Sequence, residues 1–260
     1  MQSKKKDLIP PIQYQRGCSE FYKLQFFVDE RVLIPRPETE LLVEKVIRAH
    51  PNTVLEIGTG SGCIAISIAK NLAECLVTAV DISSEALAVA HKNAVFHQVS
   101  RQIQFLQGDL LNVKIQPSPP PENSSLHSVE SDHKFEKSSV QTNSPFQAND
   151  NYFLSHIQSF DWIVANLPYI PTSRIATLDS SVKDFEPMLA LNGGDDGFDL
   201  YRKLFCQIVQ FCIHPKFFMG EIDITQSKIA MAEAQKYFPD AKVEILKDLT
   251  HRDRFILIHF

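Results

Sequence analysis

Three glycines spaced two apart, in the stretch Gly58–Gly62 (Gly-Thr-Gly-Ser-Gly), constrain the fold of this chain more than any other feature. The β-friendly run Val54–Ile57 precedes them, and Cys63–Lys70 follows with the pattern of a helix. Glycine at such a bend permits φ/ψ angles that a Cβ disfavours, and it lets a ligand lie against the backbone. The stretch therefore predicts a strand, a tight nucleotide-binding turn and a helix.

An acidic residue makes this prediction more specific. Asp81 ends the next apolar run, Leu76–Val80, about 20 residues after the turn. A carboxylate at that place can accept hydrogen bonds from both ribose hydroxyls of a bound nucleoside. The alternative is a structural strand-turn-helix unit without a ligand, and the presence of Asp81 argues against it.

The spacing and charge of the turn indicate which nucleotide it binds. A dinucleotide fingerprint requires a sixth-place glycine where this chain has Cys63, and no Gly-Lys-Ser/Thr follows to cradle phosphates. Glu56, two places before the turn, would repel a diphosphate but suits a ligand that carries an ammonium and a sulfonium. The pattern resembles motif I of the class I S-adenosylmethionine methyltransferases.

Composition sets wider bounds. The chain has 260 residues, 44% hydrophobic and 22% charged, which suits one large α/β domain with an appendage. Its formal net charge of -5 argues against a broad basic face for nucleic acid. The five cysteines include no Cys-x-x-Cys pair and the nine histidines show no ligand spacing, so we expect reduced thiols and no metal. No apolar run approaches the ~18 residues of a membrane span, so we expect a soluble, cytoplasmic protein.

The first 50 residues predict a tail, a β-hairpin and a linking helix. Residues 1–12 show neither helical nor strand period. Phe21–Val28 and Val32–Ile34 flank a polar Asp-Glu-Arg turn, which predicts the hairpin, and a helix begins after Pro37. This unit is either a lid over the glycine turn or a structural element without chemistry.

Residues 51–260 predict a doubly wound α/β domain with one interruption. Between about 113 and 158 the sequence is rich in Ser, Pro and Asn, and its apolar residues follow neither a helical nor a strand period. This composition predicts a disordered insertion. Beyond the first two strands, further strands are expected at 103–110, 160–165, 217–222, 243–246 and 255–260, and helices at 83–97, 199–213 and 225–237.

A second stretch with chemical meaning, Asn166–Tyr169 (Asn-Leu-Pro-Tyr), follows the strand at 160–165. The carboxyl ends of the strands are where ligands sit in a doubly wound sheet, so this stretch should face the methyl group. A primary amide nitrogen is a poor nucleophile because its lone pair is delocalised. The Asn166 side-chain oxygen and a main-chain carbonyl could hold both of its N–H groups and aim the lone pair. Pro168 would stiffen the turn and Tyr169 would pack against the nucleophile, unless the stretch is a plain turn.

Together these motifs resemble the HemK/PrmC family, which methylates the glutamine side-chain amide in the Gly-Gly-Gln motif of peptide chain release factors. The resemblance rests on Gln13-Tyr14 with Gly17 and Phe21, Val32–Glu40, Gly58–Gly62, Asn166–Ile170, Phe185–Pro187, Leu189–Leu191, Gly193–Gly197, Gly220-Glu221, Lys247–Leu249 and Arg252–Arg254. It implies a seven-stranded Rossmann-like sheet with an antiparallel last strand. It also implies S-adenosylmethionine as cofactor, a release factor as protein partner, no membrane or direct nucleic-acid contact, and a monomer.

The predicted site follows from the motifs and the resemblance. Cofactor-binding residues are expected to be Glu56, Gly58, Thr59, Gly60, Ser61, Gly62, Asp81, Asp109, Leu110 and Asn166. Substrate-binding residues are expected to be Asn166, Leu167, Pro168 and Tyr169, of which Asn166, Pro168 and Tyr169 are the predicted catalytic set. Asp109 would meet the adenine amino group and Leu110 would pack on the ring.

The chain departs from the family pattern in three places. Leu167 stands where the family usually has the first proline of Asn-Pro-Pro-Tyr, which should weaken positioning without abolishing it. Leu110 stands where an aromatic residue is common. The amino-terminal helical domain of the family is expected to be missing, since the hairpin begins so near residue 1.

Two rival functions remain. One is methylation of an exocyclic amine on a nucleic-acid base. A tetrapeptide of the same kind would hold that amine, with Tyr169 stacked on the flipped base. The other is a non-catalytic binding module with a degenerate methyltransferase fold. Stabilisation by S-adenosylmethionine against heat would separate an enzyme from such a module.

Overall fold

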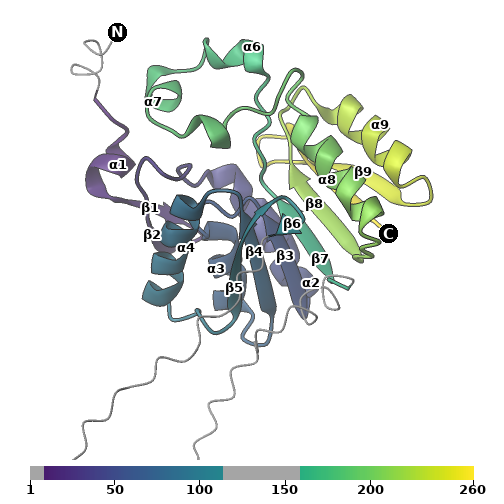
Figure 1. The fold of residues 1–260 in the computed structure, drawn as a ribbon, viewed down its shortest axis with the longest axis horizontal. Helices are drawn as coiled ribbons and strands as arrows, with labels where there is room; N and C mark the ends of the chain where they lie inside the picture. Colours follow the sequence, from purple (N-terminus) through teal and green to yellow (C-terminus); the bar gives the residue numbers. More distant parts are fainter. Residues whose placement is uncertain (1–8, 114–158) are drawn as a thin grey trace, which may run out of the picture.

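The structure is a computed structural model that describes residues 9–113 and 159–260 (Figure 1). Its centre is an eight-stranded sheet in the order β6-β5-β4-β3-β7-β8-β10-β9. The strands are β3 (Thr53–Ile57), β4 (Leu76–Asp81), β5 (Ile103–Asp109), β6 (Asn112–Val113), β7 (Trp162–Ala165), β8 (Phe217–Glu221), β9 (Lys242–Lys247) and β10 (Asp253–His259). The five strands from β5 to β8 in this order are parallel, and β10 is antiparallel to both β8 and β9. The predicted doubly wound sheet with an antiparallel last strand is confirmed.

Helices cover both faces of this sheet, as Figure 1 shows. The α-helices are α1 (Ile12–Arg16), α2 (Glu40–Ala49), α3 (Cys63–Asn71), α4 (Ser84–Phe96), α6 (Thr172–Ile175), α7 (Ser180–Lys183), α8 (Asp199–Gln210) and α9 (Ser227–Tyr237), with 3₁₀ helices η2 (Pro37–Thr39) and η3 (Met188–Ala190). No helix in these described ranges is long and apolar enough to cross a membrane.

Two hydrophobic cores lie on opposite faces of the sheet. Successive side chains of a strand point to opposite faces, so Val54 packs with α2 and α3 while its neighbour Leu55 packs with α8 and α9. Both faces of the central strands are buried, which is why their sequences read as continuous apolar runs. This burial leaves the carboxyl ends of the strands as the edge where polar side chains can gather.

The seven-strand prediction was one strand short. Asn112–Val113 forms β6, antiparallel to the end of β5, so Val113 belongs to the sheet and not to the predicted insertion. The chain reverses through Leu110, whose φ is 58°. A two-residue strand is too short to show an alternating pattern, and the turn contains no glycine to mark it. The rest of the predicted insertion lies outside the described residues.

The amino-terminal hairpin exists, but its predicted boundaries were wrong. Its strands are β1 (Cys18–Phe21) and β2 (Leu24–Phe27), and they are joined by Tyr22 and Lys23 with φ of 48° and 61°. Two-residue hairpin turns need positive φ and are normally marked by Asn-Gly or Asp-Gly, so this pair gave no signal. The expected second strand, Val32–Ile34, has an irregular backbone. Residues 12–16 form α1, a helix that was not predicted.

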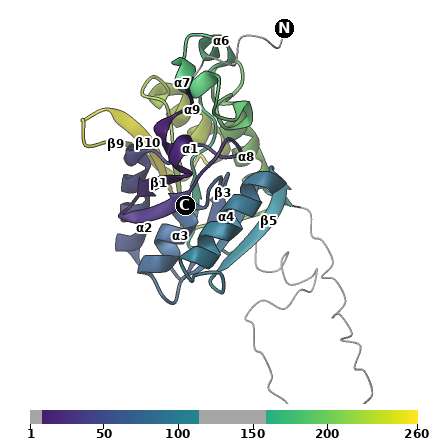
Figure 2. The same cartoon turned by 90° about the vertical axis from the view of Figure 1, so that its left-hand side faces the viewer.

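One buried side chain links the hairpin to two other parts of the fold. Asn93 of α4 accepts a hydrogen bond from Phe27 N (2.7 Å) and donates to Phe27 O (3.0 Å) and Ser61 O (2.8 Å). This amide therefore links the hairpin, α4 and the glycine turn. Figures 1 and 2 show the hairpin beside α4 accordingly.

Candidate active site

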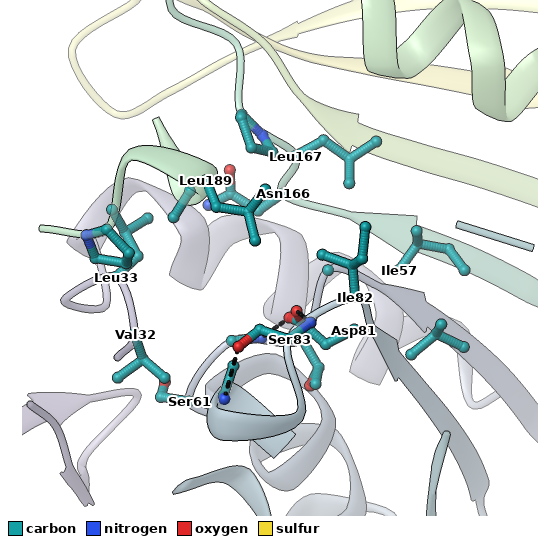
Figure 3. Close-up of a pocket in the computed structure, with 18 of the residues that line it drawn as sticks. Val32, Leu33, Ile57, Ser61, Asp81, Ile82, Ser83, Asn166, Leu167 and Leu189 are labelled. Carbon is teal, nitrogen blue, oxygen red and sulfur yellow. Dashed lines mark hydrogen bonds between the residues drawn. The ribbon is translucent and has the colours of Figure 1, made fainter. Parts of the chain in front are cut away.

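A cavity of about 550 Å³ lies where the glycine turn, the carboxyl ends of four parallel strands and two irregular segments meet (Figure 3). Asp81 and Ser83 line one side, and Asn166 and Leu167 lie across the cavity from them. The glycine turn and the Asn-Leu-Pro-Tyr stretch therefore open into one space. Of the predicted site residues, Gly62 and Tyr169 are the two that do not line it.

The glycine turn has two distinct steric environments. Gly58, Gly60 and Gly62 all have positive φ, at 77°, 55° and 81°. No heavy atom of the described residues lies within 4 Å of the place a Cβ on Gly60 would take, whereas a Cβ on Gly62 would lie 3.1 Å from the Cβ of Ala90. Gly60 thus borders open cavity, while Gly62 allows the start of α3 to approach α4 closely.

Asp81 joins the glycine turn to the end of β4. Its Oδ2 accepts a hydrogen bond from Gly60 N (2.8 Å) and its Oδ1 accepts one from Ser83 N (2.9 Å). Burial raises the pKa of this carboxyl, and these main-chain hydrogen bonds oppose that rise. Each oxygen keeps lone-pair capacity that ribose hydroxyls can use.

Glu56 is a buried carboxylate with one oxygen available. Its Oε2 accepts from Thr59 Oγ1 (2.7 Å) and from Ala65 N (3.1 Å). Its Oε1 is buried and has no hydrogen-bond partner among the described residues. Removal from water raises the pKa of Glu56 to about 8. Glu56 lines the cavity, so this unpaired oxygen can accept a hydrogen bond from a cationic ligand there.

Apolar side chains line the cavity beside the ends of β4 and β5. Leu110 is buried and lines it together with Ile82, which follows Asp81 and is 48% exposed. Asp109 lines it too, but its carboxylate forms an ion pair with Lys203 of α8, a partner that was not predicted. A flat ring would find apolar side chains here.

A wall of the cavity comes from two segments far apart in sequence. Arg36 forms an ion pair of 2.5 Å with Glu186, whose side chain is 1% exposed. This pair ties the segment after the hairpin to the loop that carries η3. Met188 and Leu189 of that loop line the cavity and are about half exposed at 49% and 58%.

Asn166 is held by its amide nitrogen. Nδ2 donates to Thr39 Oγ1 (3.0 Å) and to Glu221 Oε2 (3.2 Å). With the N–H groups engaged, Oδ1 is the end of the side chain that can accept a hydrogen bond from a substrate. This is the orientation required by the predicted role of Asn166.

Tyr169 lies differently from the prediction. Its hydroxyl donates to Glu221 Oε1 (3.2 Å), and burial beside this carboxylate raises its pKa. A buried carboxylate requires donors, and Tyr169 supplies one instead of lining the cavity with its ring. Glu221 itself was not predicted as a site residue, although it ends an apolar strand in the same way as Asp81.

Comparisons with known proteins identify relatives of this chain. A methyltransferase-domain family profile matches residues 54–124. Among curated relatives, release factor glutamine methyltransferases of Chlorobaculum tepidum, Lactococcus lactis and Thermodesulfovibrio yellowstonii are 37%, 35% and 31% identical over 75%, 95% and 95% of this chain. The matches span 56%, 77% and 76% of those proteins.

Solved structures show the same fold at low identity. A ribosomal protein L11 methylase from Lactobacillus delbrueckii has a TM-score of 0.50 at 18% identity, covering 87% of this chain and 80% of that one. The hMettl16 catalytic domain in complex with MAT2A 3′UTR hairpin 6 has a TM-score of 0.58 at 14% identity, covering 95% and 76%. With curated relatives above 30% identity across most of both chains, this chain belongs to the release factor glutamine methyltransferase family.

Proposed function

We propose that this chain uses S-adenosylmethionine to methylate the side-chain amide nitrogen of the glutamine in the Gly-Gly-Gln motif of a peptide chain release factor. One observation carries the proposal. The free acceptor of Glu56 and the oriented amide of Asn166 line the same cavity, so a cationic methyl carrier and an amide substrate can meet there. The names of the relatives supply the identity of the substrate.

The cofactor would be held by the residues of the turn and the strand ends. Glu56 pairs with its ammonium, the turn Gly58–Gly62 provides a backbone surface, and Asp81 accepts from the ribose hydroxyls. Leu110 packs on the adenine. Asp109 serves the adenine amino group only if it keeps acceptor capacity beside Lys203.

The chemistry asks the protein chiefly for orientation. S-adenosylmethionine supplies a methyl group activated by its sulfonium. Asn166 Oδ1 and a main-chain carbonyl at Leu167 or Pro168 accept the two N–H groups of the glutamine amide and aim its nitrogen. The N–C bond forms as the S–C bond breaks, and the nitrogen then loses a proton to water. No covalent enzyme intermediate and no buried general base are needed, because the nitrogen becomes acidic once it is methylated.

The decisive experiment is Asn166→Ala. Losing one of the two acceptors should lower the methylation rate of a release factor by about 100-fold or more. Cofactor binding, measured as stabilisation against heat, should persist. The readout is transfer of a labelled methyl group to the release factor, with a release factor lacking the glutamine as the substrate control.

Each other outcome has a definite meaning. Full activity of Asn166→Ala contradicts the proposal. No stabilisation of the unmodified protein by S-adenosylmethionine would make it a binding module without a cofactor. Labelling of nucleic acid in place of the release factor would favour the exocyclic-amine alternative.

We also infer that the protein acts in the cytoplasm as a monomer. Its five cysteines are all free, as in a reducing compartment. Size-exclusion chromatography with light scattering should give the mass of one chain, and a dimer mass would contradict this inference.

A further inference from the structure

A buried carboxylate stands directly behind Asn166. Glu221 lies at the carboxyl end of β8 and is 1% exposed. Its Oε2 accepts from Thr39 Oγ1 (2.5 Å) as well as from Asn166 Nδ2, and its Oε1 accepts from Tyr169. Thr39 Oγ1 in turn accepts from Asn166 Nδ2, so Glu221, Thr39 and Asn166 form a closed ring of hydrogen bonds.

We propose that Glu221, acting with Thr39, is a positioning residue that fixes which end of the Asn166 amide faces the substrate. The proposal rests on the function proposed above and adds to it. Glu221 does not line the cavity, so it acts through Asn166 and not on the substrate itself.

Counting donors and acceptors gives the physical reason. An ionised carboxylate only accepts hydrogen bonds, and Thr39 uses its single O–H to donate to it. Both groups therefore present lone pairs to Asn166. If the Asn166 amide were reversed, its oxygen would face these lone pairs, which is a repulsive and unsatisfied arrangement in a buried site. The ring of hydrogen bonds thus selects the orientation with Oδ1 available to the substrate.

The charge of Glu221 adds a second effect. A hydrogen bond from Asn166 Nδ2 to a carboxylate is stronger than one to a neutral acceptor. It draws the N–H bond towards Glu221 and polarises the amide, so Oδ1 becomes a better acceptor for the substrate N–H.

Protonation of Glu221 should undo both effects. Burial raises its pKa to about 7, against the lowering effects of the Thr39 hydrogen bond, the Arg254 charge and the Tyr169 hydrogen bond. Other titratable groups facing it are Glu38, whose charge raises the pKa, and Tyr201, which donates to the Glu221 main-chain oxygen (2.5 Å). A protonated Glu221 becomes a donor, which lets the Asn166 oxygen turn towards it. Methyl transfer should therefore fall as pH drops through this pKa.

The test compares Glu221→Gln with the unmodified enzyme across pH 5.5 to 9. Glutamine keeps the shape but cannot ionise, so kcat should fall about 10- to 100-fold. The loss of kcat at low pH should disappear in this variant. KM for the release factor and stabilisation by S-adenosylmethionine should change little. Glu186→Gln, which removes the buried carboxylate that pairs with Arg36, should keep the low-pH loss.

Thr39 provides a second test if Glu221→Gln fails to fold. Thr39→Ser keeps the hydroxyl and should retain activity, whereas Thr39→Val keeps the shape without the hydroxyl and should lose about 10-fold in kcat. Equal kcat in these two variants overturns the proposal, as does a Glu221→Gln enzyme with unchanged kcat and pH profile. If Asn166→Ala is fully active, the proposed function fails. If Asn166→Ala is inactive while Glu221→Gln and Thr39→Val are normal, only the positioning role fails.

Discussion

At the scale of single residues, the glycines of the turn have different roles although they share the same backbone conformation. Gly60 and Gly62 both occupy the left-handed region, which any other residue enters with strain of about 1–2 kcal/mol. Gly60 borders the cavity. A Cβ on Gly62, in contrast, would lie only 3.0 Å from Ile66 Cδ1 and 3.1 Å from Ala90 Cβ. One glycine therefore makes room for a ligand and the other makes room for a helix.

Alanine at these two positions should separate binding from stability. Gly62→Ala should lower the free energy of unfolding by about 2–4 kcal/mol, because overpacking adds to the backbone strain. Gly60→Ala should lower it by only about 1–2 kcal/mol but weaken S-adenosylmethionine binding, because its Cβ enters the cavity. Urea unfolding and a cofactor titration measure the two effects. Equal losses of stability would show that Gly62 has no packing role.

At the scale of elements, the hairpin is held in part by a side chain from a helix. Its two four-residue strands are too short to be stable alone. Asn93 pairs with both main-chain groups of Phe27 and with the Ser61 carbonyl, while being fully buried itself. The residues after the hairpin line the cavity, so this amide also helps to hold one of the cavity walls.

Asn93→Ala should loosen the hairpin before the sheet. Two part-buried main-chain groups of Phe27 and the buried Ser61 carbonyl lose their partner, which should lower the free energy of unfolding by roughly 2–4 kcal/mol. Hydrogen exchange at residues 18–27 should accelerate more than exchange in β3 and β4. Val95→Ala on the same helix, at a side chain that is 55% exposed, is the matched control and should change stability by less than about 0.5 kcal/mol. Equal acceleration of hydrogen exchange in the hairpin, β3 and β4 would contradict a specific role of Asn93 in holding the hairpin.

At the scale of the whole molecule, burial of Glu56 links cofactor binding to pH. In the folded chain its pKa rises from the ordinary 4.5 to about 8. The folded state then binds more protons than the unfolded state between these values. This contribution to stability is fully present below about pH 4.5 and is lost as pH rises towards 8. A cationic ligand favours the ionised form, so its binding should release a proton.

The comparison with Glu56→Gln isolates this effect. Without cofactor, the stability of the unmodified protein should decrease relative to Glu56→Gln as pH rises from 5 to 8, measured by urea unfolding. Calorimetry in buffers of different ionisation enthalpy should detect proton release on S-adenosylmethionine binding at pH 7 in the unmodified protein. Parallel stability curves for the two proteins would mean that Glu56 is already ionised in the folded state.

The parts of the fold and site that could be predicted depend on local pattern. The strand, turn and helix around Gly58–Gly62 are readable because apolar period and glycine spacing are properties of neighbouring residues. The start of α4 could be predicted for the same reason, since the side chain of Ser83 accepts a hydrogen bond from Ala86 N there. The Tyr22-Lys23 turn and strand β6 were not predicted, since neither carries the residues that usually mark such turns. The ion pair of Asp109 with Lys203 could not be predicted, because the two residues are distant in the sequence. The sequence therefore assigned Asp109 to the ligand alone.

The sequence by itself determined the type of sheet, the glycine bend with its two acidic neighbours, and the amide at the end of β7, because each is encoded within a short window. Only the tertiary structure decided what surrounds that amide. Thr39 and Glu221 are 182 residues apart and meet at Asn166 because η2 and the ends of β7 and β8 pack together. Hydrogen-bond partners of this kind are set by the packing of elements, and no local spacing records them.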